Sequence, residues 1–170
     1  MHIFLTGERQ TGKSTALRRF LAETKISADG FMTFFDVRGE NRTLYLARFD
    51  TEAADIEQRP IARITSGGVI IYGEVFESFG RQCLVEAGKR RVILMDELGS
   101  MEEGAPLFKE AVLSRLNGDK TVVGVIKAIK SPFLDAVLKH PKVEVIALTK
   151  KNRDNIPALL KELLNRDFVV

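Results

Sequence analysis

Residues 7 to 14 read Gly7-Glu8-Arg9-Gln10-Thr11-Gly12-Lys13-Ser14 and come directly after the apolar run Ile3-Phe4-Leu5. The two glycines allow the backbone to curl, so that successive N–H groups point into one concavity at the start of a helix and can hold a phosphate group there. This spacing is that of the P-loop, whose lysine reaches the β- and γ-phosphates of a nucleotide and whose serine hydroxyl binds Mg²⁺.

The residues on either side of this stretch fit a P-loop. An apolar run over 2–6 predicts a strand before it, and apolar residues at helical spacing follow it from Ala16 to Leu21. Lys13 is expected to act on the phosphates in both binding and chemistry, and Thr15 to donate to the α-phosphate. The residues expected to bind the nucleotide are Gly7, Glu8, Arg9, Gln10, Thr11, Gly12, Lys13, Ser14 and Thr15.

A second motif follows the apolar residues 92–95, where a predicted buried strand ends in Asp96 and Glu97. Ligands of open α/β sheets bind at the carboxyl ends of the strands. We expect Asp96 to hold Mg²⁺ through its water shell, opposite Ser14, and Glu97 to act as general base or to orient the attacking water. Taken alone, an Asp at this point also fits a helix cap or a surface ion pair.

Apolar runs and amphipathic stretches alternate along the chain, which predicts an α/β fold of three layers with a mostly parallel sheet. Strands are predicted over 2–6, 30–37, 44–49, 69–72, 91–96, 121–126 and 143–148, and helices over 13–24, 76–89, 106–117, 132–140 and 157–165. The interval between Lys13 and Asp96 leaves room for a further strand between the two motif strands, as in ATPases of the RecA type.

Residues 30–72 interrupt the alternation with strand-like runs and turn signals, which predicts a β-hairpin excursion beside the nucleotide site. A short helix over 52–58 is an alternative for part of it. The whole chain, residues 1–170, is expected to form a single domain.

The composition limits the partners and the compartment. The chain is 45% hydrophobic and 29% charged with a net charge of +3, and its basic residues are spread along the sequence, which argues against a nucleic-acid partner. Cys83 is the one cysteine, which excludes an internal disulfide and fits a reducing compartment. The first strand begins at once, without a secretory signal, and the apolar runs are too short to cross a membrane. We therefore expect a cytoplasmic protein.

The run Asp96-Glu97-Leu98-Gly99-Ser100-Met101-Glu102, taken with the P-loop and residues 148–157, resembles the cancer-related nucleoside-triphosphatase family. Residues 29–33 are also similar to that family's Gly-Phe-x-Thr strand. The resemblance implies Mg²⁺-dependent hydrolysis of several nucleoside triphosphates (ATP, GTP, CTP and UTP) to the diphosphate and phosphate. Family members usually have Pro or Lys where this chain has Ser100, and residues 49–76 diverge from the family.

Asn152 and Arg153 resemble the nucleobase pocket of the same family. Arg153 could stack on a base without reading its edge, which fits broad substrate use. The alternative is a helix-capping turn before Pro157, with Asp154 or Asn155 as the cap.

Several points stay open in the sequence. Phosphoryl transfer needs positive charge on the γ-phosphate, and the cations that could supply it are Arg9, Arg42, Arg48, Arg63 and Lys127. A nucleotide or small-molecule kinase would use the same phosphate cradle, and the arginines within 30–72 would suit a kinase lid. A nucleotide-binding switch without catalysis is a third alternative, and the sequence identifies no protein partner.

Overall fold

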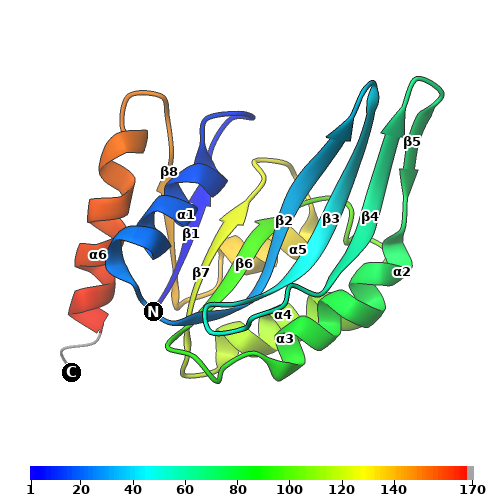
Figure 1. Cartoon of the computed structure of the whole chain (residues 1–170). Helices are drawn as coiled ribbons and strands as arrows, with labels where there is room; N and C mark the ends of the chain where they lie inside the picture. Colours follow the sequence, from blue (N-terminus) through cyan, green and yellow to red (C-terminus); the bar gives the residue numbers. More distant parts are fainter. Residues whose placement is uncertain (168–170) are drawn as a thin grey trace.

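Strands from both halves of the chain form one eight-stranded sheet in the computed structural model, which describes residues 1–167 (Figure 1). The order across the sheet is β5-β4-β3-β2-β6-β7-β1-β8. The strands are β1 (His2–Thr6), β2 (Ala28–Arg38), β3 (Asn41–Asp50), β4 (Gln58–Thr65), β5 (Gly68–Ile71), β6 (Val92–Leu98), β7 (Thr121–Ile126) and β8 (Val143–Ala147). The helices are α1 (Lys13–Thr24), α2 (Gly73–Val75), a π-helix (Phe76–Gly80), α3 (Arg81–Glu86), α4 (Pro106–Asn117), α5 (Pro132–Leu138), a 3₁₀ turn (Arg153–Asn155) and α6 (Ile156–Asp167).

Five strands make the parallel half of the sheet, in the order β2-β6-β7-β1-β8. β7 lies between β1, which leads into the P-loop, and β6, which carries the two carboxylates. This confirms the expected RecA-like arrangement. Because all five strands run the same way, their carboxyl ends meet at one edge of the sheet, and the loops after β1, β6, β7 and β8 share that edge.

The antiparallel half consists of β2, β3, β4 and β5, each paired with the next along the chain. The β-rich excursion is therefore confirmed, but β4 is missing from the predicted strands. Pro60 lies inside β4, and proline cannot donate to a sheet ladder. The pairing of β3 with β4 shifts register between Leu44 and Tyr45, and Tyr45 is the residue opposite Pro60. The proline therefore lies at an irregularity of the ladder, where a missing N–H donor is tolerated. The alternative helix over 52–58 is wrong, because those residues form turns and lead into β4.

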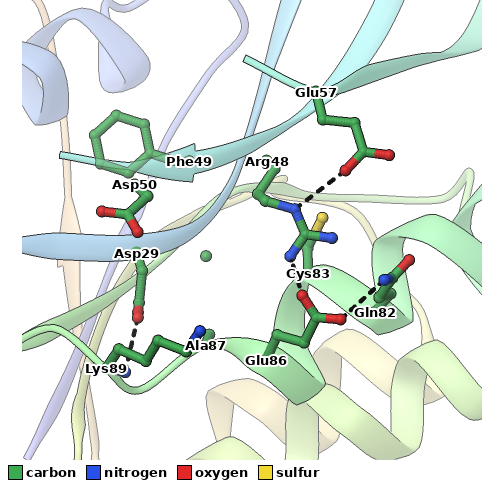
Figure 2. A pocket seen from close by; sticks show the side chains of 11 residues that line it. Asp29, Arg48, Phe49, Asp50, Glu57, Gln82, Cys83, Glu86, Ala87 and Lys89 are labelled. Carbon is green, nitrogen blue, oxygen red and sulfur yellow. Dashed lines mark hydrogen bonds and ion pairs between the residues drawn. The ribbon is translucent and has the colours of Figure 1, made fainter. Parts of the chain in front are cut away.

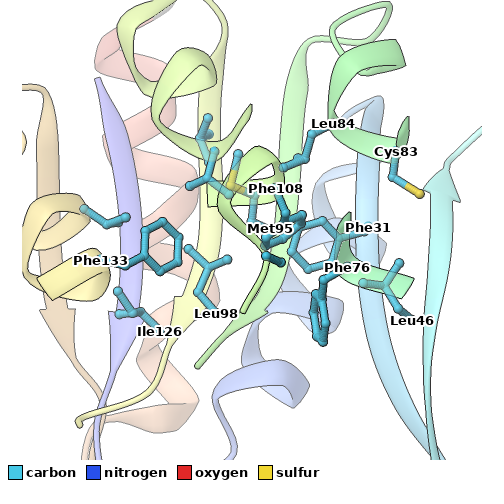
Figure 3. Packing of buried hydrophobic residues seen from close by; sticks show 14 of the residues in the cluster. Phe31, Leu46, Phe76, Cys83, Leu84, Met95, Leu98, Phe108, Ile126 and Phe133 are labelled. Carbon is cyan, nitrogen blue, oxygen red and sulfur yellow. The ribbon is translucent and has the colours of Figure 1, made fainter. Parts of the chain in front are cut away.

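Helices cover both faces of the sheet, which confirms the three layers. On one face α1 and α6 pack through Leu17, Phe20 and Leu160. On the other face, α3, α4 and α5 bury an aromatic cluster against the sheet (Figure 3). In that cluster Phe108 meets both Phe31 and Phe76 edge to face, at ring centroid distances of 5.7 and 5.4 Å.

The helix predicted over 76–89 has different limits in the structure. It begins at Gly73, passes through a π-helical turn and ends at Glu86. The buried carboxylate of Asp29 accepts hydrogen bonds from the backbone N–H groups of Gly88, Lys89 and Arg90. These donors would otherwise continue the helix, so Asp29 turns the chain into β6 instead.

Candidate functional site

The P-loop backbone depends on its glycines. Gly7 has a φ of +141°, and a Cβ at this position would lie 2.3 Å from the carbonyl oxygen of Leu148. A larger residue would therefore push the loop away from the chain that follows β8. Gly12 has a φ of +96° and directly precedes α1. The first helical hydrogen bond runs from the N–H of Ala16 to the carbonyl of Gly12, at 2.8 Å.

Lys13 folds back over the loop that it follows. Its side chain is almost fully buried, and Nζ donates to the carbonyl oxygens of Gly7, at 3.0 Å, and Glu8, at 2.7 Å. The hydroxyl of Thr11 also donates to the carbonyl of Glu8, at 2.9 Å. The carbonyls of the loop thus hold the Lys13 ammonium group beside the first N–H groups of the helix, where a phosphate would bind.

The two motifs meet through Ser14 and Asp96. The Ser14 hydroxyl donates to Oδ1 of Asp96 at 2.7 Å. Burial raises the pKa of Asp96 to about 6, against the hydrogen bond from Ser14 and the charge of Arg18, which both lower it. Arg18 is a residue that the sequence analysis missed. It lies one helical turn after Ser14 and donates to the carbonyl of Thr33 on β2, at 3.1 Å.

The oxygen donors at this point fit Mg²⁺. Mg²⁺ prefers oxygen ligands, keeps several waters and takes one or two protein groups together with substrate phosphates. Ser14 and Asp96 are two such groups in contact. Within residues 1–167, His, Cys, Asp and Glu form no cluster of three or more that could hold a metal. Two protein oxygens in contact, those of Ser14 and Asp96, suit an ion held largely by phosphate and water.

Glu97 lies next to Asp96 and forms an ion pair with Lys127. Oε1 of Glu97 is 3.2 Å from Nζ of Lys127, and the two side chains are 25% and 36% exposed. Lys127 follows β7 directly, and its backbone N–H donates to the carbonyl of Leu98 at 2.9 Å. The two side chains therefore come from adjacent parallel strands and remain open to solvent.

Glu102 is a second residue that the sequence analysis did not place in the site. It is only 2% exposed, and both of its carboxylate oxygens accept from the backbone N–H of Gly99, at 3.1 and 3.0 Å. Burial raises its pKa to about 7, while Lys127 favours the charged form. Glutamates are mostly exposed, so the sequence gives little reason to expect that Glu102 is buried. The available signal was its place in the acidic run, three residues after Gly99.

Asn152 and Arg153 follow β8 on the side of the P-loop. The Asn152 side chain accepts from the N–H of Thr149 at 2.8 Å and donates to the carbonyl of Ala147 at 3.0 Å, so it holds the turn after β8. Arg153 is exposed, and its Cδ lies 3.9 Å from where a Cβ on Gly12 would be. The structure thus brings Arg153 to the P-loop and gives Asn152 a local role in the turn.

The arginines of the antiparallel half have other partners. Arg38 pairs with Asp36 at 2.9 Å, and Arg42 lies over the ring of Phe35, 4.5 Å from its centroid. Arg48 pairs with Glu57 and Glu86, and these three residues line a cavity of about 340 Å³ (Figure 2). Lys89, which precedes β6, lines the same cavity. Arg59 pairs with Glu57 at 2.8 Å. A kinase lid would present a cluster of arginines to the phosphates of its substrates. Here the arginines named above are engaged by neighbouring acidic and aromatic side chains instead.

Comparison with known proteins identifies the family. A family model described as NTPase matches residues 2–161. The chain belongs to the NTPase family. Relatives include a nucleoside-triphosphatase THEP1 of Thermotoga maritima, which is 28% identical over 97% of this chain and 94% of its own length. The cancer-related nucleoside-triphosphatase homolog of Mus musculus is 29% identical over 91% of this chain and 92% of its own length. These matches confirm the resemblance that the acidic run and the P-loop carry.

Solved structures of similar proteins share the fold of this NTPase-family chain. The crystal structure of THEP1 from Aquifex aeolicus superimposes with a TM-score of 0.77 at 25% identity, over 96% of this chain and 99% of that one. The solution structure of a human cancer-related nucleoside triphosphatase has a TM-score of 0.72 at 24% identity, over 95% and 96%. Among the helices of residues 1–167, none has both the length and the apolar character that a membrane span requires.

Proposed function

We propose that this protein is a Mg²⁺-dependent nucleoside triphosphatase that hydrolyses ATP, GTP, CTP and UTP to the diphosphate and phosphate in the cytoplasm. The observation that carries the proposal is the 2.7 Å hydrogen bond between Ser14 and Asp96. It joins the P-loop helix to the strand with the two carboxylates, so that a phosphate-binding loop, a pair of metal-binding oxygens and a potential base share one edge of the sheet.

The P-loop residues bind and orient the triphosphate. The backbone N–H groups from Gly7 to Ser14 offer donors to the phosphate oxygens, and Thr15 adds a hydroxyl at the α-phosphate. The Lys13 ammonium, now held by two loop carbonyls, exchanges these for β- and γ-phosphate oxygens. Mg²⁺ held by Ser14 and the water shell of Asp96 supplies charge that neutralises the phosphates when bound.

Glu97 handles the proton of the attacking water. Its carboxylate is partly exposed and lies one residue beyond Asp96, so water can reach it beside the metal-binding oxygens. As general base it accepts the proton while the water oxygen attacks the γ-phosphorus.

Arg153 binds the nucleobase. It offers a flat cation beside Gly12, on which a nucleobase can stack without any recognition of the hydrogen-bonding groups on its edge. Asn152 contributes by fixing the turn that presents Arg153.

The test is phosphate release in the absence of any acceptor. The purified protein is incubated with Mg²⁺ and each of the four nucleoside triphosphates, with and without a panel of nucleosides and nucleoside monophosphates. Release of phosphate from several nucleotides without the panel supports the proposal. Turnover that appears only with the panel would identify a kinase, and tight binding without turnover would identify a switch.

A further inference from the structure

The loop after β7 begins with Lys127, which forms an ion pair with the expected base Glu97. We propose that Lys127 adds its positive charge to that of Lys13 at the γ-phosphate, and that the ion pair between Lys127 and Glu97 is the resting arrangement that a bound triphosphate displaces. This inference rests on the proposed function, since it assigns a role within that same reaction. It makes Lys127 a catalytic residue in contact with the reacting phosphate.

The position of Lys127 follows from the strand order. β7 lies between β1 and β6, and Lys127 is the first residue after β7. The loop that Lys127 begins therefore lies at the edge of the sheet where both motifs end. The hydrogen bond from its N–H to the carbonyl of Leu98, at 2.9 Å, ties its backbone to the strand that carries Glu97.

The neighbouring loop is shaped to accept the lysine. A Cβ on Gly99 would lie 2.8 Å from Cδ and 3.3 Å from Nζ of Lys127, so the lysine stem lies directly on this glycine. The Glu102 carboxylate accepts a hydrogen bond from the N–H of the same Gly99, and its negative charge attracts the ammonium group of Lys127. The ammonium is guided toward Glu97, yet the side chain stays 36% exposed and can reach a ligand.

The other cations are placed less well. Arg42 and Arg48 are engaged by Phe35 and by acidic residues in the antiparallel half, and Arg63 is exposed on β4. Arg9 is exposed on the P-loop itself. Of the five cations considered, Lys127 is the one in contact with the expected base.

The ion pair gives Lys127 two successive partners. A γ-phosphate carries more negative charge than the Glu97 carboxylate and competes for the same ammonium. Once Lys127 moves to the phosphate, Glu97 is free to accept a water proton. The water oxygen then bonds to the γ-phosphorus and the bond from that phosphorus to the bridging oxygen breaks. The electron pair leaves with the nucleoside diphosphate, and the proton passes through Glu97 to the released phosphate.

The first experiment measures binding without catalysis. Dissociation constants of ADP and of a non-hydrolysable ATP analogue, each with Mg²⁺, are measured for the wild type, Lys127→Met, Lys127→Arg and the matched control Lys130→Met. Lys130 is an exposed lysine three residues further along the same loop. We expect Lys127→Met to reduce the preference for the triphosphate analogue by about tenfold or more, since it removes a charge that meets only the γ-phosphate. Lys127→Arg should retain most of the preference, and Lys130→Met all of it.

The second experiment measures steady-state phosphate release by the same four proteins. The expected result is that Lys127→Met lowers kcat by about tenfold or more, because the charge acts in the transition state. An unchanged preference for the triphosphate analogue in Lys127→Met would overturn the proposal, even if kcat falls, because Lys127 would then only position Glu97. A wild type that releases no phosphate would refute the proposed function, while the binding ratios would still decide whether Lys127 contacts the γ-phosphate.

Discussion

Replacing the buried Glu102 by glutamine should make the free energy of unfolding less sensitive to pH. Burial raises the pKa of Glu102 from 4.5 to about 7. Below the ordinary pKa both the folded and the unfolded chain hold the proton. As the pH rises toward 7, the unfolded chain releases its proton while the folded chain keeps it, so the stability of the folded state falls. Above the folded pKa both states are ionised and the loss levels off.

The size of the effect follows from that difference. Between about pH 4 and pH 8, the shift from 4.5 to about 7 removes about 3 kcal/mol from the free energy of unfolding, at 1.36 kcal/mol for each pKa unit. Glu102→Gln keeps a carbonyl oxygen that can accept from the N–H of Gly99, but it has no charge to bury. We therefore expect the variant to gain stability over the wild type progressively as the pH rises.

Urea unfolding of the nucleotide-free protein at about pH 5, 6, 7 and 8 measures this difference. Burial also raises the pKa of Asp96 to about 6, but this contribution is common to both proteins and cancels in the comparison. Glu103→Gln, at the exposed neighbouring residue, is the control and should follow the wild type. A gap between Glu102→Gln and the wild type that stays constant from pH 5 to pH 8 would refute the reasoning.

Three further predictions concern the P-loop and the base. Glu97→Gln should not weaken nucleotide binding, since it frees Lys127 for the γ-phosphate, but it should lower kcat about a hundredfold or more, as expected for the loss of a general base; unchanged turnover in phosphate release would remove Glu97 from the mechanism. Lys13→Ala should weaken both nucleotide binding, measured by calorimetry, and turnover, because its charge meets the phosphates in the ground and transition states alike. Gly7→Ala should cost about 1–3 kcal/mol in urea unfolding, because its Cβ would meet the carbonyl of Leu148 at 2.3 Å. Gly39→Ala, at a positive φ with open space around it, is the matched control and should cost less.

The parallel half of the fold could be predicted because its signals are local. Buried parallel strands appear as short apolar runs, and the glycines and lysine of the P-loop fix the turn after β1. β4 carries no such signal, since Pro60 breaks its pattern and its pairing with β3 absorbs the proline only in three dimensions. The early end of α3 depends on Asp29, a residue far away in the sequence whose carboxylate accepts from the backbone N–H groups of residues 88–90.

The same contrast applies to the site. Ser14 and Asp96 could be paired from the sequence, because each belongs to a motif whose place at the carboxyl end of a strand is known beforehand. The burial of Glu102 and the position of Arg18 could not be predicted in this way, because residue type alone does not distinguish them from their many exposed counterparts, and the place of Glu102 in the acidic run was its one signal. Their roles arise from what the fold places next to them.

The division of the sheet explains why the chemistry gathers in one half. Parallel strands all present their carboxyl ends at one edge, so side chains far apart in the sequence, such as Lys13, Asp96 and Lys127, converge without any long-range signal. Antiparallel strands alternate in direction, and Arg38, Arg42 and Arg48 of β2 and β3 pair with acids or an aromatic ring close to them. In the proposed reaction, the parallel half supplies the positive charge at the phosphates through Lys13 and Lys127. Because β7 separates the two motif strands, its loop is the one that opens between the phosphate-binding lysine and the carboxylates, and Lys127 is its first residue.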